Sequence, residues 1–279
     1  ASMKKRNDIH YQTFKQGSKT YFNSSIFFPE EVRRDVFVLY GFVRVADNFV
    51  DEIPQRPKEF YAFRDAYRKA LAGTPSGDPI IDEFISLMAR KGFQPEWVDA
   101  FLRSMEMDLD KSEYDTIEET LEYIYGSAEV IGLFMASILE LPEESHYHAR
   151  MLGRSMQYIN FIRDIKEDLE LGRRYLPLTG SALESLDENY VKEHREEFTA
   201  FHRRQIGLYK DWHREAELGY RFIPRRYLIP IKTAEDMYLW TAEQIEKDPF
   251  IVYSGKVKPG KVRIFARIIK NFFSVRGAS

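Results

Sequence analysis

The chain has 279 residues, a net charge of −3 and no cysteine. The small net charge argues against general nucleic-acid binding, and the absence of thiols excludes disulfides, thiolate metal sites and a cysteine nucleophile. A hydrophobic content of 44 % with 30 % charged residues is typical of a folded globular protein with a large core. The opening residues, ASMKKRNDIH, place no apolar stretch behind their basic side chains, so we expect no signal peptide and a cytoplasmic location.

Apolar residues recur at helical spacing along nearly the whole chain, and no alternating strand pattern is visible. Pro29, followed by two glutamates, indicates the start of a helix that Pro54 and Pro57 close. Further helices are expected over residues 58–72, 79–91, 95–110, 116–140, 143–171, 189–219, 225–247 and 258–273. Long amphipathic helices must pack side by side to bury their apolar stripes. The sequence therefore predicts an all-α bundle forming a single domain over residues 1–279, with residues 1–14 loosely ordered.

Charged side chains interrupt the apolar run VFVLYGFVRVADNFV at residues 36–50. Arg44, Asp47 and Asp51 follow steps of three and four residues, which place them on one helix face together with Tyr40. A buried, unpaired carboxylate is very costly, so both acids require partners. Arg44 can neutralise one acid, and a divalent cation can bridge both; oxygen ligands of this kind suit Mg²⁺. The alternative is an ordinary ion-paired helix end.

A second polar stripe lies in the segment MQYINFIRDIKEDLELGRRYLP. Gln157, Asn160, Asp164 and Asp168 follow steps of three, four and four residues, and Arg163 adjoins them. If the two helices face each other across a bundle, four carboxylates point into one cavity, where they require cations and favour a polyphosphate ligand. The alternative is a polar network satisfied by its own members.

Small residues repeat every four positions in the expected helix over residues 116–140. Ala128, Gly132 and Ala136 would form a shallow groove along this helix, which also carries Tyr125 and Glu129. The groove is explained equally well by close helix packing and by room for a long apolar chain beside the metals.

The C-terminal segment, residues 255–279, carries basic residues and no acid. Its apolar residues recur at helical spacing between Ile264 and Phe273, so a basic amphipathic helix is expected over residues 258–273. The favoured interpretation is a terminal helix packed on the body with a solvated basic face. The alternative is peripheral contact with an anionic membrane.

Three motifs together resemble the squalene/phytoene synthases, which are head-to-head prenyltransferases with the class I isoprenoid synthase fold. They are R-x-x-D-N-F-V-D at residues 44–51, Q-x-x-N-F-I-R-D-I-K-E-D at 157–168 and G-R-R-Y-L-P at 172–177. SKTYF at 18–22 resembles the family's substrate flap, and YIYGSAEVIG at 123–132 resembles its Y-x-Y-x-V-A-G-x-V-G segment. The resemblance covers about residues 15 to 255. It implies a single helical bundle with a central cavity.

The sequence departs from the family pattern in two places. Asn48 stands where the family often has a second aspartate, although the Asp47 and Asp51 pair is intact. Ser127 and Glu129 replace the usual valine and glycine near Tyr125. The place of Glu129 is therefore open: it faces a neighbouring helix or trims the cavity.

The resemblance implies roles for particular residues. Mg²⁺, with Mn²⁺ as an alternative, would be held by Asp47, Asp51, Asn160, Asp164 and Asp168. The substrate diphosphates and chains would be bound by Ser18, Lys19, Thr20, Arg44, Gln157, Asn160, Arg163, Arg173 and Tyr238. Tyr40, Tyr125 and Tyr238 would stabilise a carbocation or assist proton loss.

The expected reaction joins two prenyl diphosphates head to head through a cyclopropylcarbinyl diphosphate. Two geranylgeranyl diphosphates giving phytoene is the favoured interpretation. The first alternative is squalene or dehydrosqualene synthesis from two farnesyl diphosphates, with NADPH required only by a squalene synthase. More distant alternatives are another class I terpene synthase and a non-catalytic helical scaffold. The sequence leaves a monomer and a homodimer equally open.

Overall fold

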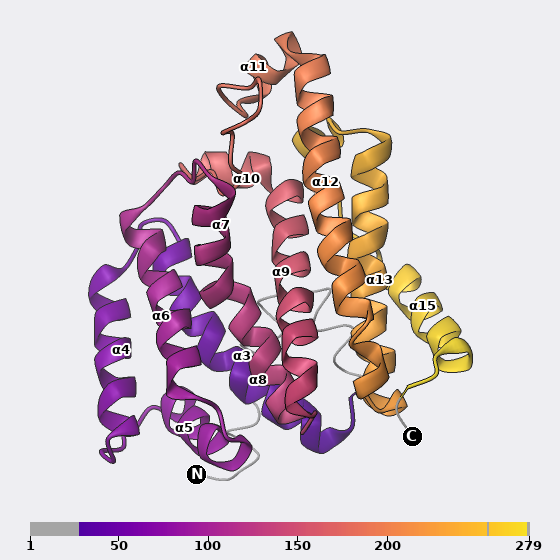
Figure 1. Cartoon of the computed structure of the whole chain (residues 1–279). Helices are drawn as coiled ribbons and strands as arrows, with labels where there is room; N and C mark the ends of the chain where they lie inside the picture. Colours follow the sequence, from indigo (N-terminus) through magenta and orange to yellow (C-terminus); the bar gives the residue numbers. More distant parts are fainter. Residues whose placement is uncertain (1–27, 256, 278–279) are drawn as a thin grey trace.

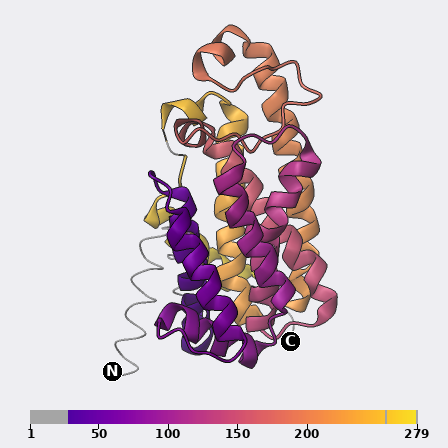
Figure 2. The same ribbon diagram turned by 90° about the vertical axis from the view of Figure 1, so that its left-hand side faces the viewer.

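The computed structural model describes residues 28–255 and 257–277, and every named element in them is helical. The α-helices are α3 (Glu30–Asp51), α4 (Pro57–Leu71), α5 (Pro79–Lys91), α6 (Pro95–Asp110), α7 (Ile117–Ile124), α8 (Val130–Ile138), α9 (His146–Arg163), α10 (Ile165–Glu170), α11 (Glu188–Glu193), α12 (Arg195–Glu217), α13 (Arg225–Lys247), α14 (Ile251–Ser254) and α15 (Lys261–Ser274). The all-α prediction is confirmed. The long helices stand side by side, with α9 between α8 and α12 (Figures 1 and 2).

Helix boundaries follow local sequence signals. Helix α5 starts at Pro79 with the Asp78 side chain accepting a hydrogen bond from the Ile80 amide, and it ends at Gly92 in a left-handed conformation. The predicted capping box at the start of α7 is present in part: Thr116 Oγ1 accepts from the Glu119 amide at 3.3 Å, but the Glu119 side chain accepts from the Asp115 amide instead of the Thr116 amide. The caps of α5 explain why the expected boundaries of residues 79–91 match this helix, and Pro95 at the first position of α6 explains the start of the helix expected over 95–110.

Three predicted helices are divided in the structure: the one expected over 189–219 breaks at His194 between α11 and α12, and two others break beside the cavity. The expected helix over 116–140 is a rod, Ile117–Ile138, in which the π-helical turn Tyr125–Glu129 separates α7 from α8. The expected helix over 143–171 divides at Asp164, where α9 ends and α10 begins. Both irregularities border the cavity described below, as is common for π turns and helix breaks at functional sites.

Close helix packing and a groove coexist along the rod. A Cβ atom added at Gly132 would lie 2.1 Å from the Ala149 carbonyl oxygen, and one added at Gly153 would lie 2.2 Å from the Ala128 carbonyl oxygen. Glycine is therefore required at both positions for α8 and α9 to approach each other. On their other side, Ala128 and Gly132 line an apolar pocket. The packing interpretation of the small-residue repeat is confirmed, and the groove interpretation stays a prediction for which this pocket leaves space.

Among the described residues, the rod Ile117–Ile138 is the one helix long and apolar enough to cross a membrane. Its most apolar window is 67 % buried inside the protein. Burial on this scale is what a core helix of a globular bundle shows.

Candidate active site

A large open cavity lies between α3, α6, the α7–α8 rod, α9 and α13. Its empty volume is about 1830 Å³, including the part that opens to solvent. Its polar lining consists of Tyr40, Arg44, Asp47, Asp51, Tyr123, Ser127, Gln157, Asn160, Arg163, Asp164, Asp168, Tyr175, Tyr238 and Lys258. The structure therefore brings together the two acidic stripes, which are more than 100 residues apart in the chain.

The α3 half of the site holds two carboxylates with different partners. Arg44 Nη1 donates to Asp47 Oδ2 at 3.2 Å, whereas Asp51 Oδ1 accepts from Arg173 Nη1 at 2.7 Å. Burial, reinforced by the charge of Asp51, raises the pKa of Asp47 to about 7. Without a bound cation, the carboxyl group of Asp47 is therefore only partly ionised at neutral pH.

The other half of the site lies at Asp164, where α9 ends and α10 begins. Arg163 donates to both oxygens of its neighbour Asp164, from Nε at 2.7 Å and from Nη2 at 2.8 Å. Burial, followed by the charges of Asp164 and Asp51, raises the pKa of Asp168 to about 8. The influence of Asp51 on Asp168 shows that the two stripes share one electrostatic environment.

The oxygen atoms of this site fit a hard divalent cation. Asn160 Oδ1, in the cavity lining, is a buried acceptor without a hydrogen-bond partner, and the carboxyls of Asp47 and Asp168 have raised pKa values. Such atoms gain a partner when a cation enters. Within the described residues no three His, Cys, Asp or Glu side chains already converge on one point. Mg²⁺ suits this arrangement, because it keeps several waters and is commonly completed by substrate phosphates.

Arg173 does not line the cavity, contrary to its predicted contact with substrate. It is 6 % exposed and lies beneath the acidic site, where it bonds Asp51 and the Val50 carbonyl and approaches Asp108 at 3.9 Å. The end of α3 binds its guanidinium, so in this structure Arg173 is directed toward Asp51 and Asp108 rather than into the cavity. The ion pair with Arg173 holds the Asp51 carboxylate in place.

A buried network below the acids was not predicted. Asp108 accepts hydrogen bonds from Tyr123 at 2.7 Å and from Tyr175 at 2.5 Å. Burial raises the pKa of Asp108 to about 6, although Arg173 opposes the shift. The sequence did carry a signal, because Asp108 lies on the apolar face of α6 that includes Phe101 and Met105.

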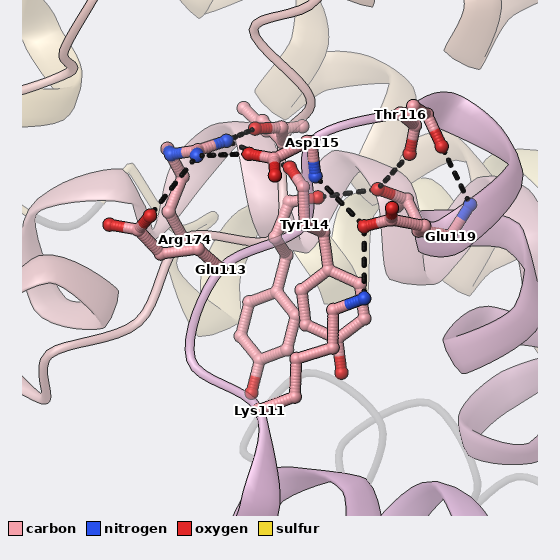
Figure 3. Close-up of polar contacts among 10 residues, drawn as sticks. Lys111, Glu113, Tyr114, Asp115, Thr116, Glu119 and Arg174 are labelled. Carbon is pink, nitrogen blue, oxygen red and sulfur yellow. Dashed lines mark hydrogen bonds and ion pairs between the residues drawn. The ribbon is translucent and has the colours of Figure 1, made fainter.

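The residue after Arg173 anchors the same loop to a second part of the chain. Arg174 donates to the Tyr114 carbonyl at 2.8 Å and to Asp115 Oδ1 at 3.1 Å (Figure 3). Lys111 Nζ donates to Glu119 Oε2 at 2.9 Å, which closes the loop onto the start of α7 (Figure 3). The two arginines of the G-R-R-Y motif therefore have different partners. Arg173 contacts the acids of the site, and Arg174 contacts the loop before α7.

Tyr125 is also placed differently from the prediction. Its side chain is 36 % exposed and is not part of the cavity lining, and the Arg150 guanidinium lies 5.5 Å from its ring centre. Glu129 faces α9, where Arg150 Nε and Arg154 Nε donate to it at 3.1 and 3.2 Å. Tyr123 and Ser127, rather than Tyr125, line the cavity.

The remaining predicted residues fall into two groups. Tyr40, Gln157, Asn160 and Tyr238 line the cavity; Gln157 Nε2 donates to Ser127 Oγ at 3.2 Å, and Asn160 is a hydrogen-bond partner of Tyr238. Burial raises the pKa of Tyr40 to about 12. Ser18, Lys19 and Thr20 lie outside the described residues. Lys258 at the cavity mouth was missed as a site residue, because the sequence only marked it as part of a basic tail.

An apolar pocket adjoins the acidic cavity. Its empty volume is about 560 Å³, and it shares Ala128, Ile131, Gly153 and Met156 with the cavity. A further apolar pocket of about 410 Å³ borders it through Gly132, Met135, Leu152 and Ile231. The site therefore combines a charged chamber with space for long hydrocarbon chains.

Comparison with known proteins shows which family has a sequence of this kind. The family model "Squalene/phytoene synthase" matches residues 14–263. A 15-cis-phytoene synthase of Pantoea ananas is 28 % identical over 250 residues, covering 85 % of this chain and 81 % of that protein. A 15-cis-phytoene synthase of Synechocystis sp. is 27 % identical over 279 residues, covering 92 % of this chain and 81 % of that protein.

Solved structures show the same fold. A squalene synthase HpnC from Alicyclobacillus acidocaldarius has a TM-score of 0.79 at 20 % identity and covers 88 % of this chain and 95 % of its own. A dehydrosqualene synthase in complex with ligand has a TM-score of 0.80 at 17 % identity and covers 96 % of both chains. Because the family model spans most of its length, the chain belongs to the squalene/phytoene synthase family and is a prenyltransferase.

Proposed function

We propose that the protein is a phytoene synthase that joins two molecules of geranylgeranyl diphosphate head to head. The observation that carries this proposal is the acidic chamber opening directly into an apolar pocket. A prenyl diphosphate has the same two parts, an anionic head and a hydrocarbon tail. The relatives named 15-cis-phytoene synthase favour this substrate and product.

The proposed cation is Mg²⁺, with Mn²⁺ as an alternative, held by Asp47, Asp51, Asn160, Asp164 and Asp168. When held by these residues, Mg²⁺ would supply positive charge and Lewis acidity toward the departing diphosphate. Arg44 and Arg163 already pair with carboxylates of each stripe. They would turn to the diphosphate oxygens, together with Lys258 at the mouth and Ser18, Lys19 and Thr20 of the flap motif.

The protein groups near the hydrocarbon would protect and steer the carbocation. Loss of diphosphate from one substrate gives an allylic cation, to which the double bond of the second substrate adds; loss of a proton from the resulting cation closes the ring of a cyclopropylcarbinyl diphosphate. Loss of the second diphosphate, rearrangement and loss of a proton then give phytoene. The ring faces of Tyr40, Tyr123 and Tyr238 border this space and can stabilise positive charge. The apolar lining excludes water that would quench the cation.

Squalene or dehydrosqualene synthesis from two farnesyl diphosphates is the second candidate. It is favoured by the solved relatives, which are titled squalene and dehydrosqualene synthases. NADPH would be needed only for squalene, because that product requires reduction of the final cation. A non-catalytic scaffold is disfavoured, since gathering four carboxylates around one cavity costs stability through charge repulsion that a scaffold has no reason to bear.

Product analysis distinguishes these candidates. Purified protein with Mg²⁺ is incubated with geranylgeranyl or farnesyl diphosphate, each with and without NADPH, and the hydrocarbon is identified by mass spectrometry. We expect a 40-carbon hydrocarbon from geranylgeranyl diphosphate, unaffected by NADPH. A 30-carbon product alone would replace the phytoene proposal by the second candidate, and no head-to-head product from either substrate would overturn both.

Filling the apolar pocket should shorten the accepted chain. Ala234 is buried on α13 and lines the pocket. Ala234→Phe is expected to lower kcat/KM for geranylgeranyl diphosphate about ten-fold or more, and for farnesyl diphosphate less, because the longer tail reaches further into the pocket. Ala72→Phe, at an exposed helix end, is the matched control. Equal losses for both substrates would contradict the placement of the tail.

The cellular location of the enzyme follows from the chemistry of the proposed substrates and product. Its substrates and product carry long hydrocarbon chains, so we propose a cytoplasmic protein in peripheral contact with a membrane through residues 258–273. A monomer and a homodimer both remain compatible with the described surface.

A further inference from the structure

Helix α15 is firmly attached to the body of the protein. Ile264 and Ile268 are buried against α13, and Asn271 Nδ2 donates to Thr233 Oγ1 at 3.1 Å and to Asp236 Oδ2 at 3.0 Å. Figure 1 shows α15 on the outer side of α13. The contacts of the inner face of α15 therefore agree with the favoured prediction of a terminal helix packed on the body.

The outer surface of α15 differs from that prediction, because it is apolar as well as basic. Five large apolar side chains are exposed on it, out of ten such side chains in the whole described part of the chain. Their exposed fractions are 84 % for Val262, 57 % for Phe265, 45 % for Ile269, 54 % for Phe272 and 82 % for Phe273. We call these five residues the outer apolar face. Exposed apolar patches of this kind mark surfaces that bind a partner.

The spacing of these residues makes the outer apolar face continuous. Val262, Phe265, Ile269 and Phe272 follow steps of three, four and three residues, which keep them on one side of the helix. Phe273 extends the face, with its ring centre 5.4 Å from that of Phe272. The buried residues Ile264 and Ile268 follow a separate stripe, so the outer face is available while α15 stays docked on α13.

Positive charge borders the outer apolar face. Lys261 and Lys270 are exposed on α15, and residues 255–279 contain no acid. The Arg225 guanidinium lies 5.0 Å from the ring centre of Phe272 and donates to the Val275 carbonyl at 3.1 Å. Arg226 beside it is exposed. A partner of this surface must therefore be both apolar and negatively charged, as an anionic lipid bilayer is.

If the proposed function holds, the outer apolar face lies where membrane-borne substrate would enter the protein. Lys258 lines the mouth of the acidic cavity, and α15 begins only three residues later at Lys261. A bilayer in contact with α15 would thus lie near the mouth through which amphiphilic diphosphates enter.

We propose that the protein docks on anionic membranes through α15, with the outer apolar face inserted below the lipid headgroups and the bordering lysines and arginines among them. The helix lies in the plane of the interface and stays attached to α13. This goes beyond general membrane contact, because it assigns the inserted residues and leaves the inner face of α15 in the protein.

Vesicle sedimentation of the full chain tests the proposal. Phosphatidylcholine vesicles with and without phosphatidylglycerol are incubated with the wild type, with the triple variant Phe265→Ser, Ile269→Ser, Phe273→Ser, and with Leu218→Ser. Leu218 is 57 % exposed but lies at the end of α12, so its variant is the matched control. Far-UV circular dichroism and light scattering establish that each variant is folded and give its mass.

We expect the wild type and Leu218→Ser to bind anionic vesicles, and the triple variant to bind about ten-fold or more weakly, because inserted apolar area supplies much of the affinity. Binding of the wild type should also weaken without phosphatidylglycerol. Three results would overturn the proposal: no binding by the wild type, equal binding by the triple variant, or a wild-type dimer that the triple variant abolishes, since a second copy would then cover the face. Binding needs no turnover, so its outcome is independent of product analysis.

Discussion

Asp168→Asn is expected to abolish Mg²⁺-dependent turnover while leaving the helical fold intact. Asp168 belongs to the acidic pair of α9 and α10, and an amide is a much weaker ligand for Mg²⁺ than a carboxylate. A fall in kcat/KM of about a thousand-fold or more is expected, because each such group stabilises charge that develops in the transition state. Steady-state assays with Asp47→Asn as a second variant measure it, and near-wild-type turnover in both would refute the metal assignment.

The same variant should stabilise the metal-free protein at alkaline pH. Since the folded-state pKa of Asp168 is raised to about 8 and that of Asp47 to about 7, the folded state binds more protons than the unfolded chain between about pH 4 and 8. Stability of the wild type without metal should therefore fall as pH rises through this window. Removing one carboxylate should recover about 1–3 kcal/mol at pH 8, which corresponds to several degrees in Tm.

Thermal unfolding with and without Mg²⁺ tests whether the stability of the metal-free protein falls as the pH rises. The wild type should gain Tm on addition of Mg²⁺ at pH 8 and gain little at pH 5, where the two carboxyls are protonated. Asp168→Asn should show a smaller response to both pH and Mg²⁺. A wild type whose metal-free Tm rises from pH 6 to pH 8 would contradict the raised pKa values.

Arg173→Met is expected to damage both stability and activity. It removes a guanidinium that contacts Asp51 at 2.7 Å and lies 3.9 Å from the buried Asp108. Removing one partner of a buried ion pair leaves a charge uncompensated and typically costs about 3–5 kcal/mol. Asp51 would also lose its orientation toward the cavity, so kcat should fall about a hundred-fold or more.

The neighbouring arginine supplies the control for this prediction. Arg174→Met removes the same side chain one residue away, but the acidic partners of Arg174, Glu113 and Asp115, are exposed. Its loss should loosen the loop and lower stability, with a smaller effect on turnover. Asp108→Asn in the Arg173→Met background should recover part of the stability, because it removes the unpaired acid. The positioning role of Arg173 would be refuted if Arg174→Met reduced kcat as strongly as Arg173→Met.

The case of Arg173 also shows where reasoning from the sequence ends. An arginine near two acids in the chain is equally compatible with binding a ligand and with being buried beneath it. The difference depends on Val50 and Asp108, which belong to other helices, so no local pattern could distinguish the two. Tyr123 and Tyr125 present a similar problem, because residues two positions apart point to different sides of a helix, and only the packing of that helix decides which side faces the cavity.

The sequence by itself determined the helical class, most helix positions, the two acidic stripes and the family, because each depends on spacing within one helix or on a local motif. Only the tertiary structure decided that the stripes meet in one cavity and that Asp108 and Arg173 support them from below. It also showed that α15 buries one stripe and exposes another. The physical reason is common to these points: burial and pairing are properties of contacts between helices, and residues far apart in the chain make those contacts.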